Sequence, residues 1–151
     1  MARRVRSRIK LLERILVAVD GSEPSRRALH HAVNIAKTMG ARVTIAHSVV
    51  WEPLAPSRQR RAMRQLAEEF DERGETILKK MSAEVAHSGV EVELVLLHGP
   101  AGEAVTKLAA AGNYDLVVVG VRGRSLASRL LLGSVADRII RICNGPVLVV
   151  H

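Results

Sequence analysis

The chain has 151 residues, 48% of them hydrophobic, and a formal net charge of +8. This length suits one domain with a real core, and no apolar run approaches the roughly 20 residues of a membrane-spanning helix. The single cysteine, Cys143, excludes an internal disulfide, and one Phe, one Tyr and one Trp are too few for the stacking surfaces of single-strand nucleic-acid binders.

The first 13 residues form a basic arm, which leaves residues 14–151 for the domain. The arm has no clear period and holds Arg3, Arg4, Arg6, Arg8 and Lys10. It can be a solvated extension or a contact with a partner or a membrane, and both interpretations stay open. Its start lacks an apolar core and a cleavage site, so we expect no signal peptide. Together with the single cysteine, this favours a cytoplasmic location.

The first third of the domain predicts a strand, a helix and a second strand. Residues 15–19 are a short apolar block closed by Asp20, which is typical of a buried parallel strand. Ser22 can cap the helix that follows, and Gly40 ends its apolar face. Residues 42–49 are β-branched and apolar enough for the second strand.

The middle of the chain predicts a long amphipathic segment. Apolar residues recur at three- and four-residue steps over about residues 57–88, which indicates one long helix or two joined near Gly74. The arginines on its first turns are expected to be a solvated face. Residues 90–97 then predict a strand partly exposed at the sheet edge, and a short helix runs from Pro100 to Gly112.

The last quarter predicts a strand, a glycine-rich loop, a helix and a final strand. Residues 116–119 are fully apolar, and the loop after them ends at Gly133 and Ser134. A helix follows, with a predicted inward stripe of Val135, Ile139, Ile140 and Ile142. Cys143 near its end is expected to be a small buried hydrophobe. Residues 147–150 form the last strand.

Strands and helices that alternate in this way predict an α/β domain. Each parallel crossover needs a covering helix, so we expect an open five-stranded parallel sheet with helices on both faces. Ligands of such sheets bind outside the carboxyl ends of the strands, where the strand order reverses. If the first and fourth strands are central neighbours, Asp20 and Gly120 meet there.

The glycine-rich loop predicts a phosphate-binding site. Glycines let the backbone approach a ligand closely, and the free N–H groups and the dipole of a helix start favour an anion. Ser134 is predicted to be the helix N-cap and a hydroxyl donor at once. The loop glycines can instead be simple turn formers, and Asp20 can merely cap a turn.

The spacing of this loop resembles a known signature. From Gly120, two residues lead to Gly123 and nine more to Gly133, which Ser134 follows. This pattern resembles the ATP-binding signature of the universal stress protein family. ILVAVDGSEPS from residue 15 and PVLVV from residue 146 are similar to its first and last strands. The resemblance implies an adenine nucleotide alpha hydrolase-like fold with sheet order 3-2-1-4-5.

The resemblance also implies a set of ATP contacts. Ala18, Val19 and Asp20 would line the adenine and ribose side, and Ser48 would meet the base. The ribose and phosphates would be held by Gly120, Arg122, Gly123, Gly133, Ser134 and Val135. The Arg122 side chain could clamp a phosphate or turn to solvent. Magnesium or manganese would arrive with the phosphates, and Asp20 is the nearest candidate carboxylate.

The residues favour nucleotide binding over turnover. No G-x-x-x-x-G-K-[ST] motif is present, so hydrolysis is expected to be slow at most. His47 is expected to be a packed polar residue. The remaining histidines show no metal-ligand spacing with Cys143, so we predict no protein metal site. No catalytic residue is assigned.

Three functions follow as hypotheses. The first is an ATP-binding stress-response module that senses or sequesters nucleotide and acts through an unknown protein partner. The second is a slow ATPase or nucleotide-transfer enzyme on the same site, and the third is a nucleotide-free dimerisation domain. Sequence-specific nucleic-acid binding is not expected. An apolar edge strand of Val147, Leu148, Val149 and Val150 predicts a homodimer, which the resemblance also implies.

Overall fold

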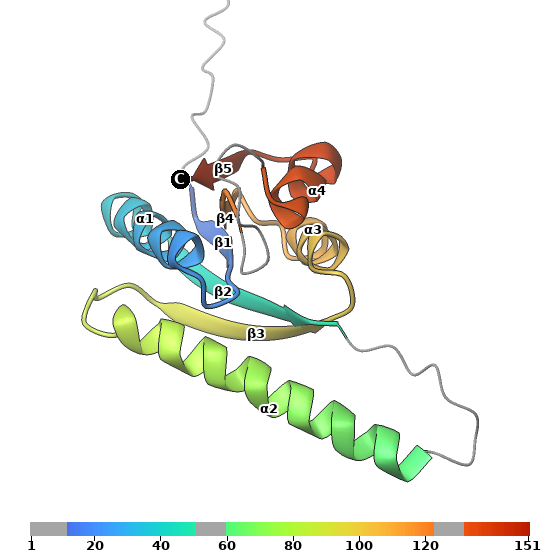
Figure 1. The fold of residues 1–151 in the computed structure, drawn as a ribbon. Helices are drawn as coiled ribbons and strands as arrows, with labels where there is room; N and C mark the ends of the chain where they lie inside the picture. The colour runs from blue at the N-terminus through green and yellow to red at the C-terminus, as the bar shows by residue number, and fades with distance from the viewer. Residues whose placement is uncertain (1–11, 51–59, 123–131) are drawn as a thin grey trace, which may run out of the picture.

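A five-stranded parallel sheet organises the chain in a computed structural model that describes residues 12–50, 60–122 and 132–151. The sheet order is β3-β2-β1-β4-β5, and helices join the strands (Figure 1). The elements are β1 Arg14–Ala18, α1 Glu23–Met39, β2 Arg42–Val49, α2 Arg60–Glu84, β3 Val92–His98, α3 Ala101–Ala111, β4 Leu116–Gly120, α4 Ser134–Ile142 and β5 Val147–Val150. The α/β class and the order 3-2-1-4-5 are therefore confirmed. Among the described helices, none is long and apolar enough to cross a bilayer.

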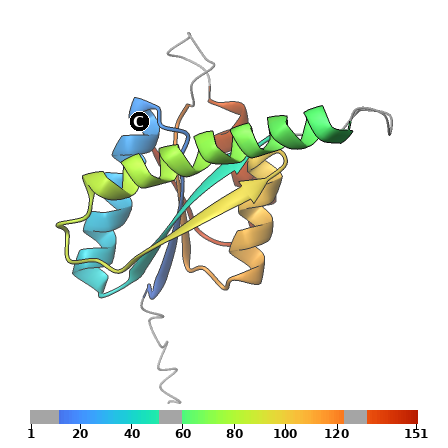
Figure 2. The same ribbon diagram turned by 90° about the horizontal axis from the view of Figure 1, so that it is seen from below.

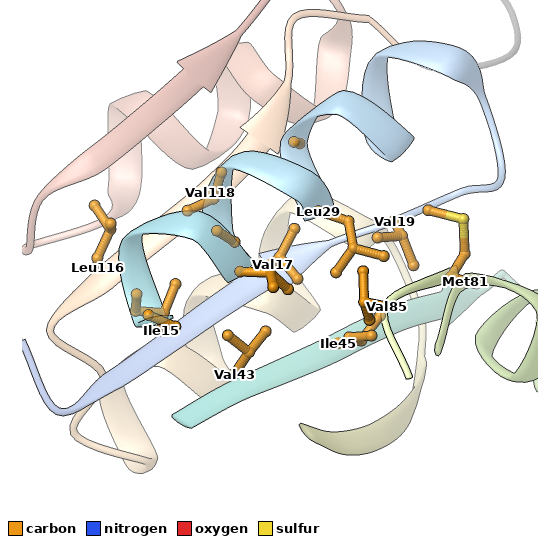
Figure 3. Close-up of a cluster of buried hydrophobic side chains, with 14 of the residues drawn as sticks. Ile15, Val17, Val19, Leu29, Val43, Ile45, Met81, Val85, Leu116 and Val118 are labelled. Atoms are coloured by element: carbon orange, nitrogen blue, oxygen red, sulfur yellow. The ribbon is translucent and has the colours of Figure 1, made fainter. Parts of the chain in front are cut away.

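The helices form two layers, one on each face of the sheet. Successive residues of a strand point to opposite faces, so β1 contributes to both layers. Ile15 and Val17 pack with α1 and α2, as Figure 3 shows, while Leu16 and Ala18 pack with α3 and α4. The central strands are buried on both faces, which explains why their sequences are apolar at consecutive positions.

Helix α1 begins and ends where its capping residues predict. Ser22 is the N-cap, and its hydroxyl accepts the Ser25 N–H at 3.4 Å. Gly40 ends the helix in the left-handed conformation, at φ 69°, and donates its N–H to the Ala36 carbonyl. The chain therefore leaves the carboxyl end of β1 and enters α1 through a defined turn.

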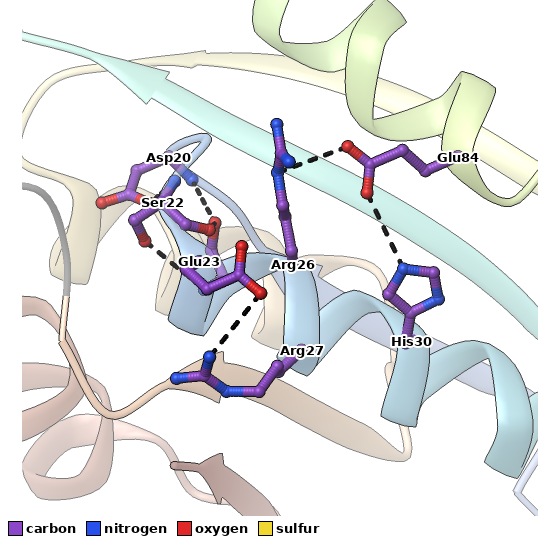
Figure 4. A network of polar contacts seen from close by, with 8 residues as sticks. Asp20, Ser22, Glu23, Arg26, Arg27, His30 and Glu84 are labelled. Atoms are coloured by element: carbon purple, nitrogen blue, oxygen red, sulfur yellow. Dashed lines mark hydrogen bonds and ion pairs between the residues drawn. The ribbon is translucent and has the colours of Figure 1, made fainter.

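Helix α2 is one continuous helix, which decides between the two alternatives left by the sequence. Gly74 does not break it, because the helix packs against the sheet at this residue. A Cβ at Gly74 would lie 2.6 Å from Leu96 Cδ1 and 2.9 Å from Val49 Cγ1. Glu84 near the end of α2 also pairs with Arg26 and His30 of α1 (Figure 4).

Helix α4 departs from the predicted apolar stripe. Its buried residues are Ala136 and Ile139, whereas Ile140 and Ile142 are 46% and 37% exposed. Neighbouring residues of a helix point about 100° apart, so Ile139 and Ile140 cannot both face the sheet. Cys143 at the helix end is half-buried rather than fully buried.

The end of β4 supports the start of α1. A Cβ at Gly120 would lie 2.7 Å from the Pro24 carbonyl carbon and 2.9 Å from the Ser25 nitrogen. Both atoms belong to the backbone of the first turn of α1. Only a glycine lets this turn sit directly over the end of the strand.

We expect Gly74→Val to destabilise the domain. Valine has a better helix propensity than glycine, but here its side chain would overpack against Leu96 and Val49. Overpacking of this kind costs about 1–3 kcal/mol, which urea denaturation followed by circular dichroism measures. Lys80→Val, at an exposed position of α2, is the control. Equal stability of the two variants would contradict close packing at Gly74.

Gly120→Ala is also expected to destabilise the domain by about 1–3 kcal/mol, because the added methyl group meets backbone that cannot rotate away. Gly145→Ala is the matched control, since nothing lies within 4 Å of a Cβ at that position. Thermal denaturation compares the two variants. A melting temperature for Gly120→Ala equal to that of Gly145→Ala would show that α1 does not depend on this contact.

Candidate functional site

A cavity of about 240 Å³ opens at the carboxyl ends of the central strands. β1 lies between β2 and β4, so the chain connections diverge here and leave a crevice above the strand ends. The cavity is lined by Ala18, Val19, Asp20, Ser25, Ala46, His47, Ser48, Ala101, Val105, Val119, Gly120, Arg122, Gly133, Ser134, Val135 and Ala136.

The structure brings together most of the residues singled out from the sequence. Those that line this one cavity are Ala18, Val19, Asp20, Ser48, Gly120, Arg122, Gly133, Ser134 and Val135. Gly123 falls outside the described residues. The pairing of β1 with β4, in which Ala18 lies beside Val119, explains how distant segments meet.

The turn after β1 is held by side chains. Asp20 Oδ1 accepts the Ser22 N–H at 2.9 Å, and the Asp20 N–H donates to Ser25 Oγ at 3.3 Å (Figure 4). Ser25 Oγ in turn donates to the Ser22 carbonyl at 2.9 Å. Asp20 thus shapes the turn and lines the cavity at the same time. Ser25 is buried, and its place in the site was not predicted because the sequence marks it only as a first-turn helix residue.

The end of β2 supplies two polar residues that are already hydrogen-bonded. His47 Nδ1 lies 2.7 Å from the Val19 carbonyl, and since a carbonyl only accepts, Nδ1 carries the proton. His47 is therefore a packed polar residue, as predicted. Ser48 Oγ donates to the Gly99 carbonyl at 2.7 Å. Its proton thus holds the loop between β3 and α3. Ser48 also lines the cavity, and its contact with a base stays a prediction.

Small apolar side chains form one half of the cavity. Ala18 and Ala46 come from the strand ends, and Ala101 and Val105 come from the first turns of α3. The sequence placed Ala101 and Val105 on the inner face of this helix but did not assign them to the site. The signal was Pro100, which starts the helix directly after the carboxyl end of β3. This half of the cavity suits a flat apolar ring.

The start of α4 forms the other half and corrects one prediction. The N-cap is Gly133, not Ser134. Gly133 has an extended backbone, at φ −65° and ψ 149°, and its carbonyl accepts the first helical hydrogen bond from the Asp137 N–H at 2.9 Å. Its own N–H donates to the Val121 carbonyl at 2.8 Å, which anchors the helix start to the end of β4. Ser134 is the first helical residue and is exposed.

Helices α3 and α4 approach each other closely behind this helix start. Gly102 is buried, and a Cβ there would lie 2.7 Å from Arg138 Cβ. Arg138 Nε also donates to Glu103 Oε1 at 2.7 Å. The two helices therefore hold the apolar half and the helix start in a fixed relation.

The backbone at the start of α4, rather than the side-chain charges, favours an anion in this cavity. Among the described lining residues, Asp20 is the one carboxylate and Arg122 is a half-buried cation. Asp137 adds a charge in the first turn of α4, where its hydrogen bond with Arg141 lowers the pKa of the carboxyl. The free N–H groups of the first helical turn point out of the helix end. No group of three metal-binding side chains occurs among the residues that the structure describes.

Comparison with known proteins places the chain in a family. The profile of the Universal stress protein family matches residues 12–151. A universal stress protein of Methanocaldococcus jannaschii is 33% identical over 97% of this chain and 86% of its own. A universal stress protein solved in complex with cAMP is 30% identical, with a TM-score of 0.72 over 93% of this chain and 98% of its own. A structure from Archaeoglobus fulgidus in complex with dAMP is 22% identical, with a TM-score of 0.67 over 93% of this chain and 99% of its own. The chain belongs to the universal stress protein family.

Proposed function

We propose that this protein binds an adenine nucleotide, and ATP in particular, in the cavity at the carboxyl ends of β1, β2 and β4. The observation that carries this proposal is the combination of an apolar wall and a helix N-terminus in one cavity. A nucleotide has the same two halves, a flat base and a charged phosphate chain.

The apolar half receives the base in this proposal. Ala18, Ala46, Ala101 and Val105 leave room for a ring and cover its faces. Asp20, at the end of β1, accepts hydrogen bonds from the ribose hydroxyls. Ser48 acts on the base indirectly. Its hydrogen bond to Gly99 fixes the loop that leads into α3, which begins at Ala101.

The phosphates lie at the start of α4. The N–H groups of Ser134 and Val135 belong to the first helical turn and have no partner within the helix. The helix dipole adds about half a positive charge at this end. Gly133, tied to Val121, sets the direction of these donors. Arg122 adds a cation to the same cavity.

The relatives support an adenine nucleotide as the ligand class. One solved universal stress protein holds cAMP and another holds dAMP. These ligands share adenine and at least one phosphate, which are the two parts that the cavity suits. ATP is the form that the loop signature favours, with magnesium or manganese carried by its phosphates.

The site favours retention of the nucleotide over its hydrolysis. The described lining holds no lysine that could reach a terminal phosphate, and its one carboxylate, Asp20, already accepts a hydrogen bond from the α1 turn. We infer a regulatory module of the stress response that reports nucleotide occupancy to a protein partner. Bound nucleotide would fix α1, α3 and α4 around one ligand.

The edge strand β5 is proposed to form a homodimer. In the described part of the chain, β5 pairs with β4 alone, and Val147, Leu148 and Val149 are only half-buried. Ile140 and Ile142 of α4 are exposed next to it in sequence. A two-fold axis lets the strand pair with its own copy, so that neither β5 edge stays open.

Ser134→Glu is expected to weaken ATP binding at least tenfold relative to Ser134→Gln. The two side chains have nearly the same shape, but the carboxylate repels phosphate at the helix start. The fold should remain intact, because an acidic residue at a helix N-terminus stabilises it by about 0.3–1 kcal/mol. Titration calorimetry gives the two affinities. Equal affinities of the two variants would show that the phosphates do not lie at this helix start. If the unmodified protein bound no ATP, the proposed function itself would be wrong.

Leu148→Lys should remove the β5 contact and halve the mass of the particle, because a charge on the edge strand opposes pairing. His151→Lys, just beyond the strand, is the control and should keep the original mass. Sedimentation velocity measures both. An unchanged mass for Leu148→Lys would exclude β5 as the dimer contact.

A further inference from the structure

Helix α2 extends well beyond the sheet that it covers. Its second half packs on the sheet through buried Leu78 and Met81, and buried Val85 follows directly after the helix. Its first half continues past the tip of β3, as Figures 1 and 2 show. We call residues 60–71 the overhang.

The overhang keeps an apolar stripe although little of the sheet lies beneath it. Met63, Ala67 and Phe70 continue the line of Gly74, Leu78 and Met81 on the same face of the helix. They are half-buried, and Leu66 beside them is 42% exposed. A solvated helix end has no need of such a stripe, which therefore indicates a contact surface.

The charges of the overhang complement one another. The first turn of α2 contains no acidic residue, and Arg61 in this turn and Arg64 just after it are exposed. Cations at a helix N-terminus oppose the helix dipole, so an acidic neighbour would stabilise them. The next turns supply such acids in Glu68, Glu69, Asp71 and Glu72. These acids would repel a nucleic acid or an anionic membrane, so the charge pattern favours a second copy of the same helix.

We propose that two overhangs pair antiparallel about a two-fold axis between Leu66 and Ala67. In this arrangement Met63 lies opposite Phe70 of the second copy, and Leu66 lies near its own symmetry mate. Arg64 and Asp71 are seven residues apart, which is about two turns, so they share one flank of the stripe. The two-fold axis brings these flanks together and places Arg64 near Asp71 of the second copy, with an offset of about 3 Å along the helices that the long arginine side chain can span. The symmetry forms this pair twice.

Asp71 is able to take this second partner. Its Oδ1 lies 2.9 Å from His98 Nε2 of its own chain, while its side chain is 43% exposed. Two segments of about three turns form a smaller contact than a standard interface of roughly 1,600 Å². The association is therefore expected in the micromolar range. This contact does not involve the nucleotide site or β5, because β5 lies at the opposite edge of the sheet from β3.

A charge exchange tests the pairing. Arg64→Asp and Asp71→Arg should each halve the mass measured by sedimentation velocity, since each places like charges opposite one another. The double variant should restore the original mass. His98→Ala is the control, because it removes the bond between Asp71 and His98 within one chain. This variant should keep the mass of the unmodified protein. If β5 also pairs, the single variants should fall to the mass of the β5 dimer rather than to that of a monomer.

Cross-linking tests the orientation. In a Cys143→Ala background, Leu66→Cys should form an intermolecular disulfide under mild oxidation, because the two copies of residue 66 lie near the axis. Ala62→Cys should not, because its two copies are offset by about 13 Å along the helices, beyond the roughly 7 Å that a disulfide spans between Cα atoms.

Three results would overturn the proposal. The first is an equal mass for the unmodified protein and both single charge variants. The second is equal cross-linking at positions 62 and 66, which would indicate a parallel or random contact. The third is loss of mass in the double variant as well, which would show that Arg64 and Asp71 do not face each other.

Discussion

The parallel pairing of β1 with β4 is the constraint on which the rest of this structure depends. With Ala18 beside Val119, the two strands end together, and the segments that follow them leave from one place. Gly120 then lets the first turn of α1 sit on the end of β4. The turn after β1 and the loop after β4 thus border one cavity, although they lie far apart in the sequence.

The cavity owes much of its character to backbone. The start of α4 offers N–H groups, and Gly133 is its N-cap. Gly99, with a positive φ, shapes the loop between β3 and α3. Hydrogen bonds between side chains and the backbone hold these segments, as those of Ser48 and His47 show. A site of this kind binds through preformed geometry, with few charged side chains. This agrees with a module that holds a nucleotide without hydrolysing it.

Much of the fold was predictable because its signals are local or periodic. The apolar blocks of the central strands and the Ser22 and Gly40 caps of α1 fix their elements, and the family resemblance supplied the sheet order. The details that failed depend on tertiary contacts. Gly133 is the cap of α4 because its N–H bonds Val121, and no local pattern shows that bond.

The candidate site was predictable in outline for a similar reason. Glycine spacing and strand ends identify the β1 and β4 sides, whereas Ala101 and Val105 look like ordinary core residues until the sheet places them at the cavity. The hydrogen bond of the Ser48 hydroxyl to Gly99, which lies 51 residues away, also has no signal in the sequence. The role of Gly120 in supporting α1 also needed the structure, since its φ is not of the kind that requires glycine.

Nuclear magnetic resonance on the labelled protein tests the central claim most directly. Titration with ATP should shift the amide signals of Val19, Ser48, Ala101 and Ser134, which border the cavity from four different elements or turns. The signals of Asn113 and Cys143, at the opposite end of the sheet, should stay in place. Shifts confined to other regions, or none at millimolar ATP, would contradict a nucleotide site at the carboxyl ends of β1, β2 and β4.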